Sequence, residues 1–263
     1  MNQRTPIIAG NWKMNNTASE GVALVNSIKP LVADAKCEVV VCVPAIDIPA
    51  VAQALQGSNI ALGAQNVHFA EKGAYTGEIS AAMLKEYGVK YVIIGHSERR
   101  QYFGETDETV NKRTLTALAA GLIPIVCIGE TLEERESGKT EAVLDRQITE
   151  GLKGIDDISK IVIAYEHVWA IGTGKTATSE QANETIGYIR KKCAEVFCPK
   201  CAEKVRIQYG GSMNAGNCKQ LMAMPEIDGG LIGGASLKAN DFATIVNYDK
   251  NGMQGMKLPK DLL

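Results

Sequence analysis

Four side chains with catalytic potential each stand at the end of a short run of apolar, β-branched residues. Asn11 and Lys13 follow the first run, His96 follows the fourth, and Glu166 follows the sixth. An amide, a cation, an imidazole and a carboxylate together suit general acid–base chemistry and the stabilisation of negative charge. The set has neither a serine–histidine–acid order nor a metal-ligand cluster. We therefore expect an acid–base site without a metal.

Two glycine pairs follow the last two runs. Gly210-Gly211 precedes Ser212, and Gly233-Gly234 stands after the eighth run. Glycine lets the backbone approach a ligand closely, and its N–H groups can then point at an anion. Barrels of parallel strands frequently bind phosphate at the loops after their seventh and eighth strands. The two pairs therefore predict a phosphate site.

Each of these residues also has a purely structural explanation. Lys13 could be a solvated surface lysine, His96 a hydrogen-bonded structural histidine, and Glu166 a helix-opening or ion-paired carboxylate. Glycine pairs usually serve turns. Their joint placement at strand ends favours a functional explanation over a structural one, because the carboxyl ends of barrel strands form one face.

Eight β-branched runs with helical segments between them predict the strands that position these residues. The runs are Pro6–Ala9, Glu38–Val43, Ile60–Ala64, Tyr91–Ile94, Ile123–Ile128, Ile161–Tyr165, Val205–Tyr209 and Gly230–Ile232. Near-continuous apolar runs are typical of parallel strands covered on both faces, and the spacing leaves room for crossover helices. The pattern predicts one α/β domain over residues 1–263, a (β/α)8 barrel with a surface extension from about residue 249. A doubly wound open sheet is the alternative.

Two capping boxes predict helix starts. Thr17 stands three residues before Glu20, and Thr178 three residues before Gln181. Each motif opens a stretch in which apolar residues recur at helical spacing.

Composition restricts the class of partner. Apolar residues make up 45% of the 263 residues, charged residues 22%, and the formal net charge is −2. A nucleic-acid partner usually requires a basic face, so we expect none. No stretch approaches the roughly 20 apolar residues of a membrane span, and the N-terminus has no signal-peptide pattern. Seven cysteines without the density of a disulfide scaffold predict reduced thiols and a cytoplasmic protein.

Eight motifs resemble the triosephosphate isomerase family and occur in its order from residue 9 to residue 236. They are Ala9-Gly10-Asn11-Trp12-Lys13-Met14-Asn15, Gln65-Asn66-Val67, Ile94-Gly95-His96-Ser97-Glu98-Arg99-Arg100, Cys127-Ile128-Gly129-Glu130, Ala164-Tyr165-Glu166, Trp169-Ala170-Ile171-Gly172-Thr173-Gly174, Tyr209-Gly210-Gly211-Ser212 and Gly233-Gly234-Ala235-Ser236. The resemblance implies a (β/α)8 TIM barrel that interconverts D-glyceraldehyde 3-phosphate and dihydroxyacetone phosphate through an enediolate, in glycolysis and gluconeogenesis. It implies no cofactor, because the reaction involves no net oxidation.

The resemblance also implies catalytic roles, and this family is itself a standard example of tuned acid–base chemistry. Glu166 would be the base. A neutral His96 would polarise the carbonyl and move protons between the two oxygens. Lys13 and Asn11 would stabilise negative charge, and Glu98 would orient Lys13.

The substrate phosphate would bind backbone N–H groups of four residues, Gly172, Ser212, Gly233 and Gly234. Residues from about 167 to 176 would form a lid that excludes water. The Gln65–Ser80 loop would make a homodimer by docking around Met14 of a second subunit, with Thr76 near that subunit's Asn11 and Glu78 near its Arg99.

Two features depart from the family picture. His167 replaces the usual proline after the base. We expect its imidazole to be exposed, to titrate near roughly pH 6.5, and to weaken Glu166 as a base when protonated. Cys193, Cys198 and Cys201 have a C-x4-C-x2-C spacing. It could supply half of a zinc knuckle, but without a second matching pair we expect no stoichiometric metal, only accessible surface thiols that oxidise or alkylate slowly.

Three other functions compete with this interpretation of the sequence. Gly174-Lys175-Thr176 is similar to the end of a phosphate-binding P-loop, but Trp169 stands where that motif requires glycine. A non-catalytic binding barrel predicts loss of Lys13, His96 or Glu166, and all three are present. The third rival is another sugar-phosphate isomerase on the same fold, since fold alone does not determine function. The short lid motif and the small set of glycines favour a three-carbon substrate.

Overall fold

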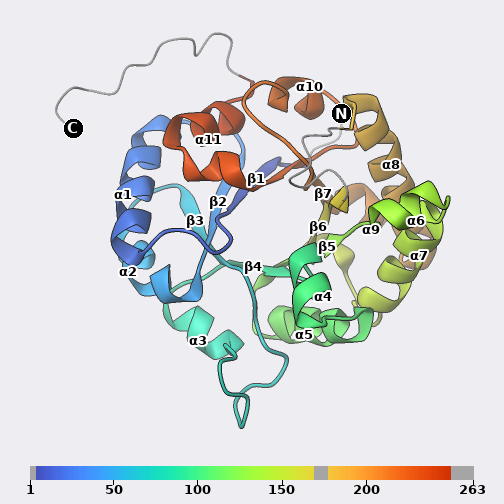
Figure 1. The fold of residues 1–263 in the computed structure, drawn as a ribbon, viewed down its shortest axis with the longest axis horizontal. Coiled ribbons are helices and arrows are strands. Elements are labelled where there is room, and N and C mark those ends of the chain that lie inside the picture. Colours follow the sequence, from blue (N-terminus) through green and yellow to red (C-terminus); the bar gives the residue numbers. More distant parts are fainter. Residues whose placement is uncertain (1–3, 169–176, 250–263) are drawn as a thin grey trace.

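The computed structural model describes residues 4–168 and 177–249, and within them eight parallel strands close into a barrel in sequence order (Figure 1). The strands are β1 (Ile7–Asn11), β2 (Glu38–Val43), β3 (Ile60–Ala64), β4 (Tyr91–Ile94), β5 (Ile123–Ile128), β6 (Val162–Tyr165), β7 (Arg206–Tyr209) and β8 (Gly229–Ile232). Closure pairs β8 with β1. The predicted barrel is therefore confirmed, and the open sheet is excluded.

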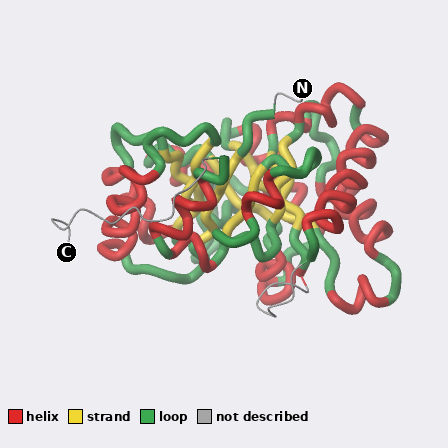
Figure 2. Tube along the Cα trace, turned by 90° about the horizontal axis from the view of Figure 1, so that it is seen from above, coloured by secondary structure: helices red, strands yellow, loops and turns green. Residues whose placement is uncertain are grey.

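Helices surround the barrel on the outside (Figures 1 and 2). They are α1 (Ala18–Ile28), α2 (Ile48–Ala54), α3 (Ala81–Glu86), α4 (Ser97–Phe103), α5 (Asp107–Ala119), α6 (Leu132–Glu136), α7 (Thr140–Gly151), α8 (Ser179–Val196), α9 (Pro199–Lys204), α10 (Cys218–Met222) and α11 (Ala239–Val246). Both predicted capping boxes are present, with Thr17 opening α1 and Thr178 opening α8. Within the described ranges no helix is long and apolar enough to cross a membrane.

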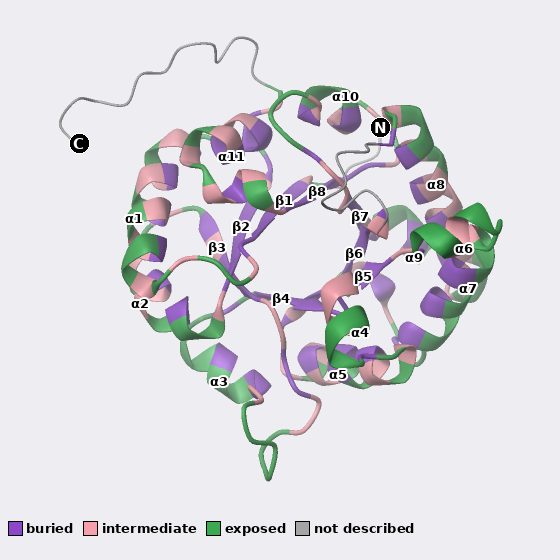
Figure 3. Cartoon of the chain, viewed as in Figure 1, coloured by how far each residue is buried: buried purple, intermediate pink, exposed green. Residues whose placement is uncertain are grey.

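The core has two layers, because successive side chains of a strand point to opposite faces. Inward-facing side chains fill the barrel, and outward-facing ones pack beneath the helices. Figure 3 shows buried strands in the centre and helices whose exposed faces turn outward. The inner layer consists of Ile7, Ala9, Val40, Cys42, Tyr91, Ile93, Ile125, Cys127, Val162, Ala164 and Leu231. Since the interior is filled with side chains, chemistry is confined to the barrel's ends.

Strand boundaries agree with the sequence predictions within two residues. The largest difference is in β1, which continues through Gly10 and Asn11, where it pairs with Val41 and Cys42 of β2. Closure also depends on one glycine. Gly229 has φ 149°, and a Cβ there would overlap the carbonyl oxygen of Ile7 on β1. The predicted extension lies outside the described residues from residue 250 onward.

Two of the seven cysteines depart from the expectation that every cysteine is a reduced thiol. Cys198 and Cys201 form a disulfide, whereas the other five cysteines are free and buried. The expectation of accessible free thiols at this pair was therefore wrong. Cys193 belongs to the apolar core, and the described residues contain no group of three or more side chains arranged to hold a metal ion.

Candidate active site

Lys13 is held in an unusual backbone conformation just after β1. Its φ is 55°, a left-handed value that a residue with a side chain rarely adopts. Its N–H donates to Asn11 Oδ1 at 3.1 Å, and its carbonyl oxygen accepts from Gln65 Nε2 at 2.9 Å. Such strain persists only where surrounding contacts impose it, and it is common at functional sites.

Glu98 forms an ion pair with the side chain of Lys13. Lys13 Nζ lies 2.6 Å from Glu98 Oε1, with both side chains about one-third exposed. Glu98 lies in the first turn of α4, which follows β4, whereas Lys13 follows β1. The pair therefore connects two strand ends across the mouth of the barrel.

The His96 ring contacts both Glu98 and Glu166. Its Nδ1 accepts the backbone N–H of Glu98 at 3.2 Å, and its Nε2 lies 3.4 Å from Glu166 Oε2. A neutral imidazole that accepts at Nδ1 carries its proton on Nε2. His96 therefore directs an N–H donor into the space beside the carboxylate.

Glu166 is almost fully buried at the end of β6, with 1% of its surface exposed. The Ser97 hydroxyl donates to Glu166 Oε2 at 2.6 Å, and the Ser97 N–H donates to Oε1 at 3.3 Å. Burial raises the pKa of the nearby Cys127 thiol well above its usual range, and the negative charge of Glu166 adds to that effect. A Cβ at Gly210 would lie 3.0 Å from Glu166 Cγ, so glycine leaves room for the carboxylate.

A cavity of about 390 Å³ opens beside Lys13 and His96, and Glu166 is not part of its lining. It is lined by most of the residues predicted for catalysis and phosphate binding: Asn11, Lys13, His96, Ser212, Gly233 and Gly234. A Cβ placed on Gly234 would meet no atom within 4 Å, so this glycine faces open space. The predicted phosphate ligand Gly172 lies outside the described residues, as does most of the predicted lid.

The expectation for His167 was wrong. Its side chain is buried, and its ring lies 4.5 Å from the Tyr165 ring and 5.6 Å from the Tyr209 ring, between centroids. Burial lowers the pKa of His167 to about 3, and the positive charge of Arg135 contributes in the same direction. His167 is therefore neutral near pH 6.5 and cannot act there as a charged neighbour of Glu166.

Two residues that hold the site received no role from the sequence. Ser97 holds the carboxylate of Glu166, and Gln65 fixes the backbone of Lys13. Both lie in motifs that carry the resemblance. The only sequence signal for Ser97 was its position next to His96 at the start of a helix.

A closed barrel of eight parallel strands, with titratable side chains and a glycine-rich rim at the carboxyl ends of its strands, is the architecture of a (β/α)8-barrel enzyme. A family model described as triosephosphate isomerase matches residues 6–249. The chain belongs to the triosephosphate isomerase family.

Individual relatives agree with this assignment. The triosephosphate isomerase of Clostridium botulinum (strain Okra / Type B1) is 64% identical over 247 residues, which cover 93% of this chain and 100% of the relative. That of Clostridium novyi (strain NT) is 62% identical over 249 residues, covering 94% and 100%. The crystal structure of triosephosphate isomerase from Bartonella henselae is 43% identical with a TM-score of 0.86, and the match covers 93% of this chain and 98% of that one.

Proposed function

We propose that this chain interconverts D-glyceraldehyde 3-phosphate and dihydroxyacetone phosphate through an enediolate, in the glycolysis and gluconeogenesis of the cytoplasm. The observation that carries the proposal is the pairing of His96 Nε2 with Glu166 Oε2 at 3.4 Å beside a cavity lined by Lys13. A carbonyl compound in that cavity would have a base, an N–H donor and a cation within reach.

Glu166 is the general base that removes the proton α to the carbonyl and returns it to the adjacent carbon. At rest its carboxylate accepts two hydrogen bonds from Ser97. Both oxygens are thereby engaged, so the carboxylate must leave Ser97 to receive a proton from carbon. General base catalysis of this kind contributes roughly 10²- to 10⁴-fold.

His96 and Lys13 stabilise the enediolate as negative charge develops on oxygen. The Nε2–H of His96 donates to the carbonyl oxygen and moves protons between the two oxygens, while Lys13, held by Glu98, supplies positive charge. Asn11 supports Lys13, because its Oδ1 accepts a hydrogen bond from the backbone N–H of Lys13. Because these groups are held in place before reaction, each contributes about 2.7–4 kcal/mol.

The phosphate of the substrate occupies the rim formed by Ser212, Gly233 and Gly234, with Gly172 added from the family resemblance. Support comes from the placement of the first three residues around the cavity and from the open space beside Gly234.

The proposal is tested with a coupled assay on glyceraldehyde 3-phosphate. Glu166→Ala is expected to lower kcat by several orders of magnitude, while inorganic phosphate still binds with nearly unchanged affinity. Glu136→Ala, on exposed α6, is the control and should retain full activity. Turnover by Glu166→Ala within about tenfold of the native enzyme would remove this residue from the role of base.

A homodimer formed through the Gln65–Ser80 loop belongs to the same proposal. The loop projects from the barrel between β3 and α3, and residues 71–77 are all exposed (Figures 1 and 3). Met14 and Phe103 are exposed by 96% and 67% beside a second cavity of about 350 Å³ that they help to line. That cavity also reaches Lys13 and His96, so an occupying loop would complete the wall of the site.

In the proposed dimer the loop of one protomer docks around the partner's Met14, with Thr76 near the partner's Asn11. Within one protomer Arg99 already pairs with Glu105 at 2.6 Å, and Glu78 lies 3.4 Å from Arg113. The contact between Glu78 and the partner's Arg99 would extend these existing pairs.

Light scattering with parallel activity measurements tests the dimer. Met14→Glu should give a monomer with reduced activity, because a charge is placed where the loop packs. Leu132→Glu on α6 changes an exposed apolar residue away from the loop and should leave the dimer intact. A fully active native monomer at nanomolar concentration would overturn the assembly.

A further inference from the structure

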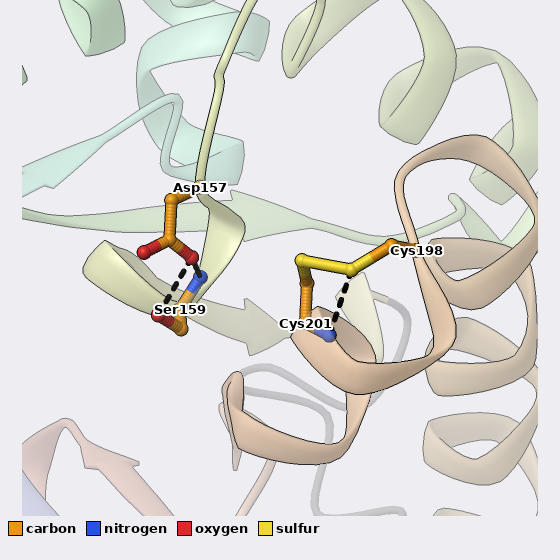
Figure 4. The surroundings of a disulfide bond; sticks show 4 residues. All are labelled: Asp157, Ser159, Cys198 and Cys201. Carbon is orange, nitrogen blue, oxygen red and sulfur yellow. Dashed lines mark hydrogen bonds between the residues drawn. A yellow bond between two sulfur atoms is a disulfide. The ribbon is translucent and has the colours of Figure 1, made fainter.

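The disulfide between Cys198 and Cys201 has no role in the proposed isomerisation. It lies where the chain leaves α8 and enters α9, beside the short 3-10 helix Ile158–Lys160 (Figure 4). We propose that this pair is a reversible dithiol–disulfide couple that exchanges with external dithiols and controls the stability of the α8–α9 corner without altering catalysis.

Accessibility separates this pair from the other five cysteines. Cys198 and Cys201 are both partly exposed, whereas the free cysteines are buried. Burial raises the pKa of Cys37, Cys42 and Cys193 to about 12. Because the thiolate is the nucleophile in exchange, those buried thiols are unreactive near neutral pH. An external thiol can therefore reach only the Cys198–Cys201 pair among the described cysteines.

A hydrogen bond makes the two sulfurs unequal. The backbone N–H of Cys201 donates to Cys198 Sγ at 3.0 Å (Figure 4). The same donor would stabilise a thiolate on Cys198, because hydrogen bonding to the charged form favours it. Cys198 is therefore the better leaving group on reduction and the better nucleophile on reoxidation.

The exchange proceeds in two balanced steps. A thiolate of an external dithiol attacks Cys201 Sγ, forming a mixed disulfide while the bond to Cys198 breaks and Cys198 leaves as a thiolate. The second thiol of the reductant then attacks the sulfur that the reductant contributed to the mixed disulfide. This closes the cyclic disulfide of the reductant and releases Cys201 as a thiol. Two electrons and two protons pass to the protein, and the reductant becomes a cyclic disulfide.

The fold holds α9 independently of the disulfide. Arg190 on α8 donates through Nη1 to the carbonyl oxygens of Ala202 and Val205, each at 2.8 Å. Reduction therefore loosens the corner without releasing the helix. The corner precedes the amino end of β7, whereas the proposed catalytic residues follow carboxyl ends of strands, so the two sites lie at opposite ends of the barrel.

The test begins with the native enzyme before and after dithiothreitol and desalting. We expect two additional thiols to react with a chromogenic disulfide reagent in the folded protein, a lower Tm, and kcat/KM unchanged within twofold. Oxidised glutathione should restore the original Tm. The Cys198→Ser/Cys201→Ser double variant should have the Tm of the reduced enzyme under both conditions. A gain of two thiols only after denaturation would overturn the proposal, as would a Tm indifferent to reduction.

Single variants test the inequality of the two sulfurs. Cys201→Ser keeps the backbone donor and leaves Cys198 as the reactive thiol, whereas Cys198→Ser leaves Cys201 alone. Iodoacetamide at pH 7 should alkylate Cys201→Ser at least tenfold faster than Cys198→Ser. Equal rates would overturn the assignment of Cys198. About one zinc per native chain, after purification without added metal, would overturn the couple altogether and support a metal knuckle.

Discussion

The Ser97 hydroxyl lies 2.6 Å from Oε2 of Glu166 and donates a hydrogen bond to it, although 69 residues separate the two along the chain. The proposed base is therefore held at rest by the residue that follows His96. Since Glu166 is buried, loss of this donor leaves a carboxylate oxygen poorly solvated.

A double-mutant cycle measures what this contact contributes. Ser97→Ala should destabilise the enzyme by about 1.5–3 kcal/mol, because a hydrogen bond to a buried charge is lost. In a Glu166→Ala background the same change should have almost no effect, since no carboxylate remains. Thermal unfolding of the four proteins gives the coupling energy, and an equal loss in both backgrounds would contradict the contact. We expect kcat/KM of Ser97→Ala to remain within tenfold of the native value.

The strained backbone of Lys13 predicts an unusual order of stabilities. At φ 55°, Lys13→Gly relieves about 1–2 kcal/mol of strain, which exceeds the roughly 0.4–1 kcal/mol by which glycine favours the unfolded chain. Lys13→Gly should therefore be about 1 kcal/mol more stable than Lys13→Ala, although both lack the ammonium and should be equally impaired in catalysis.

Lys191 supplies the matched comparison, because it is exposed in the interior of α8. The Lys191→Gly variant should be less stable than Lys191→Ala by about 1 kcal/mol, the reverse of the order expected at Lys13. Chemical denaturation of the four variants decides the matter. The same order at both positions would show that Lys13 is not strained in solution.

The sequence predicted the barrel well because parallel strands buried on both faces have a clear pattern. Glu38–Val43 and Ile123–Ile128 are β-branched and apolar, and the structure gives these strands the same limits. The end of β1 was missed because Gly10 and Asn11 lack that pattern and are placed only by pairing with β2. Local patterns therefore define strands best where the residues themselves favour the conformation.

The errors have a common origin in tertiary geometry. His167 was expected to be exposed, but it packs against Tyr165 and Tyr209 from two strands. The spacing of Cys198 and Cys201 fitted thiols or a metal site, and a disulfide requires their Cα atoms to lie close together, here 5.3 Å apart. Neither relationship can be read from spacing alone.

The open space beside Gly234 predicts a substitution that affects binding but not folding. Gly234→Ala adds a methyl group that meets no atom within 4 Å, so Tm should stay the same while KM rises as the methyl group enters the phosphate cavity. Gly187→Ala on α8 is the control, since its Cβ would make an ordinary 3.5 Å contact with Glu226. Steady-state kinetics and thermal unfolding report the two effects. An unchanged KM for Gly234→Ala would place the phosphate elsewhere.

The buried imidazole of His167 predicts how stability depends on pH. Burial, with a contribution from Arg135, lowers its pKa to about 3, whereas an unfolded chain has a histidine pKa near roughly 6.5. Between these values the unfolded state binds more protons than the folded state, so stability must fall as pH falls through this window. The loss reaches about 1.4 kcal/mol per pH unit from this residue alone.

Replacing His167 with a residue that does not titrate isolates this contribution. His167→Pro and His167→Gln should both lose stability less steeply than the native enzyme between pH 6.5 and about 3. Chemical unfolding at several pH values gives the slopes. Because the imidazole is already neutral at pH 6.5, the fall of kcat/KM on acidification above pH 5 should be the same in the native and substituted enzymes. If the stability of the native enzyme fell with pH as gradually as that of both variants, the His167 ring would be hydrated in solution. If the native enzyme lost kcat/KM more steeply than the variants, His167 would again be a charged neighbour of Glu166.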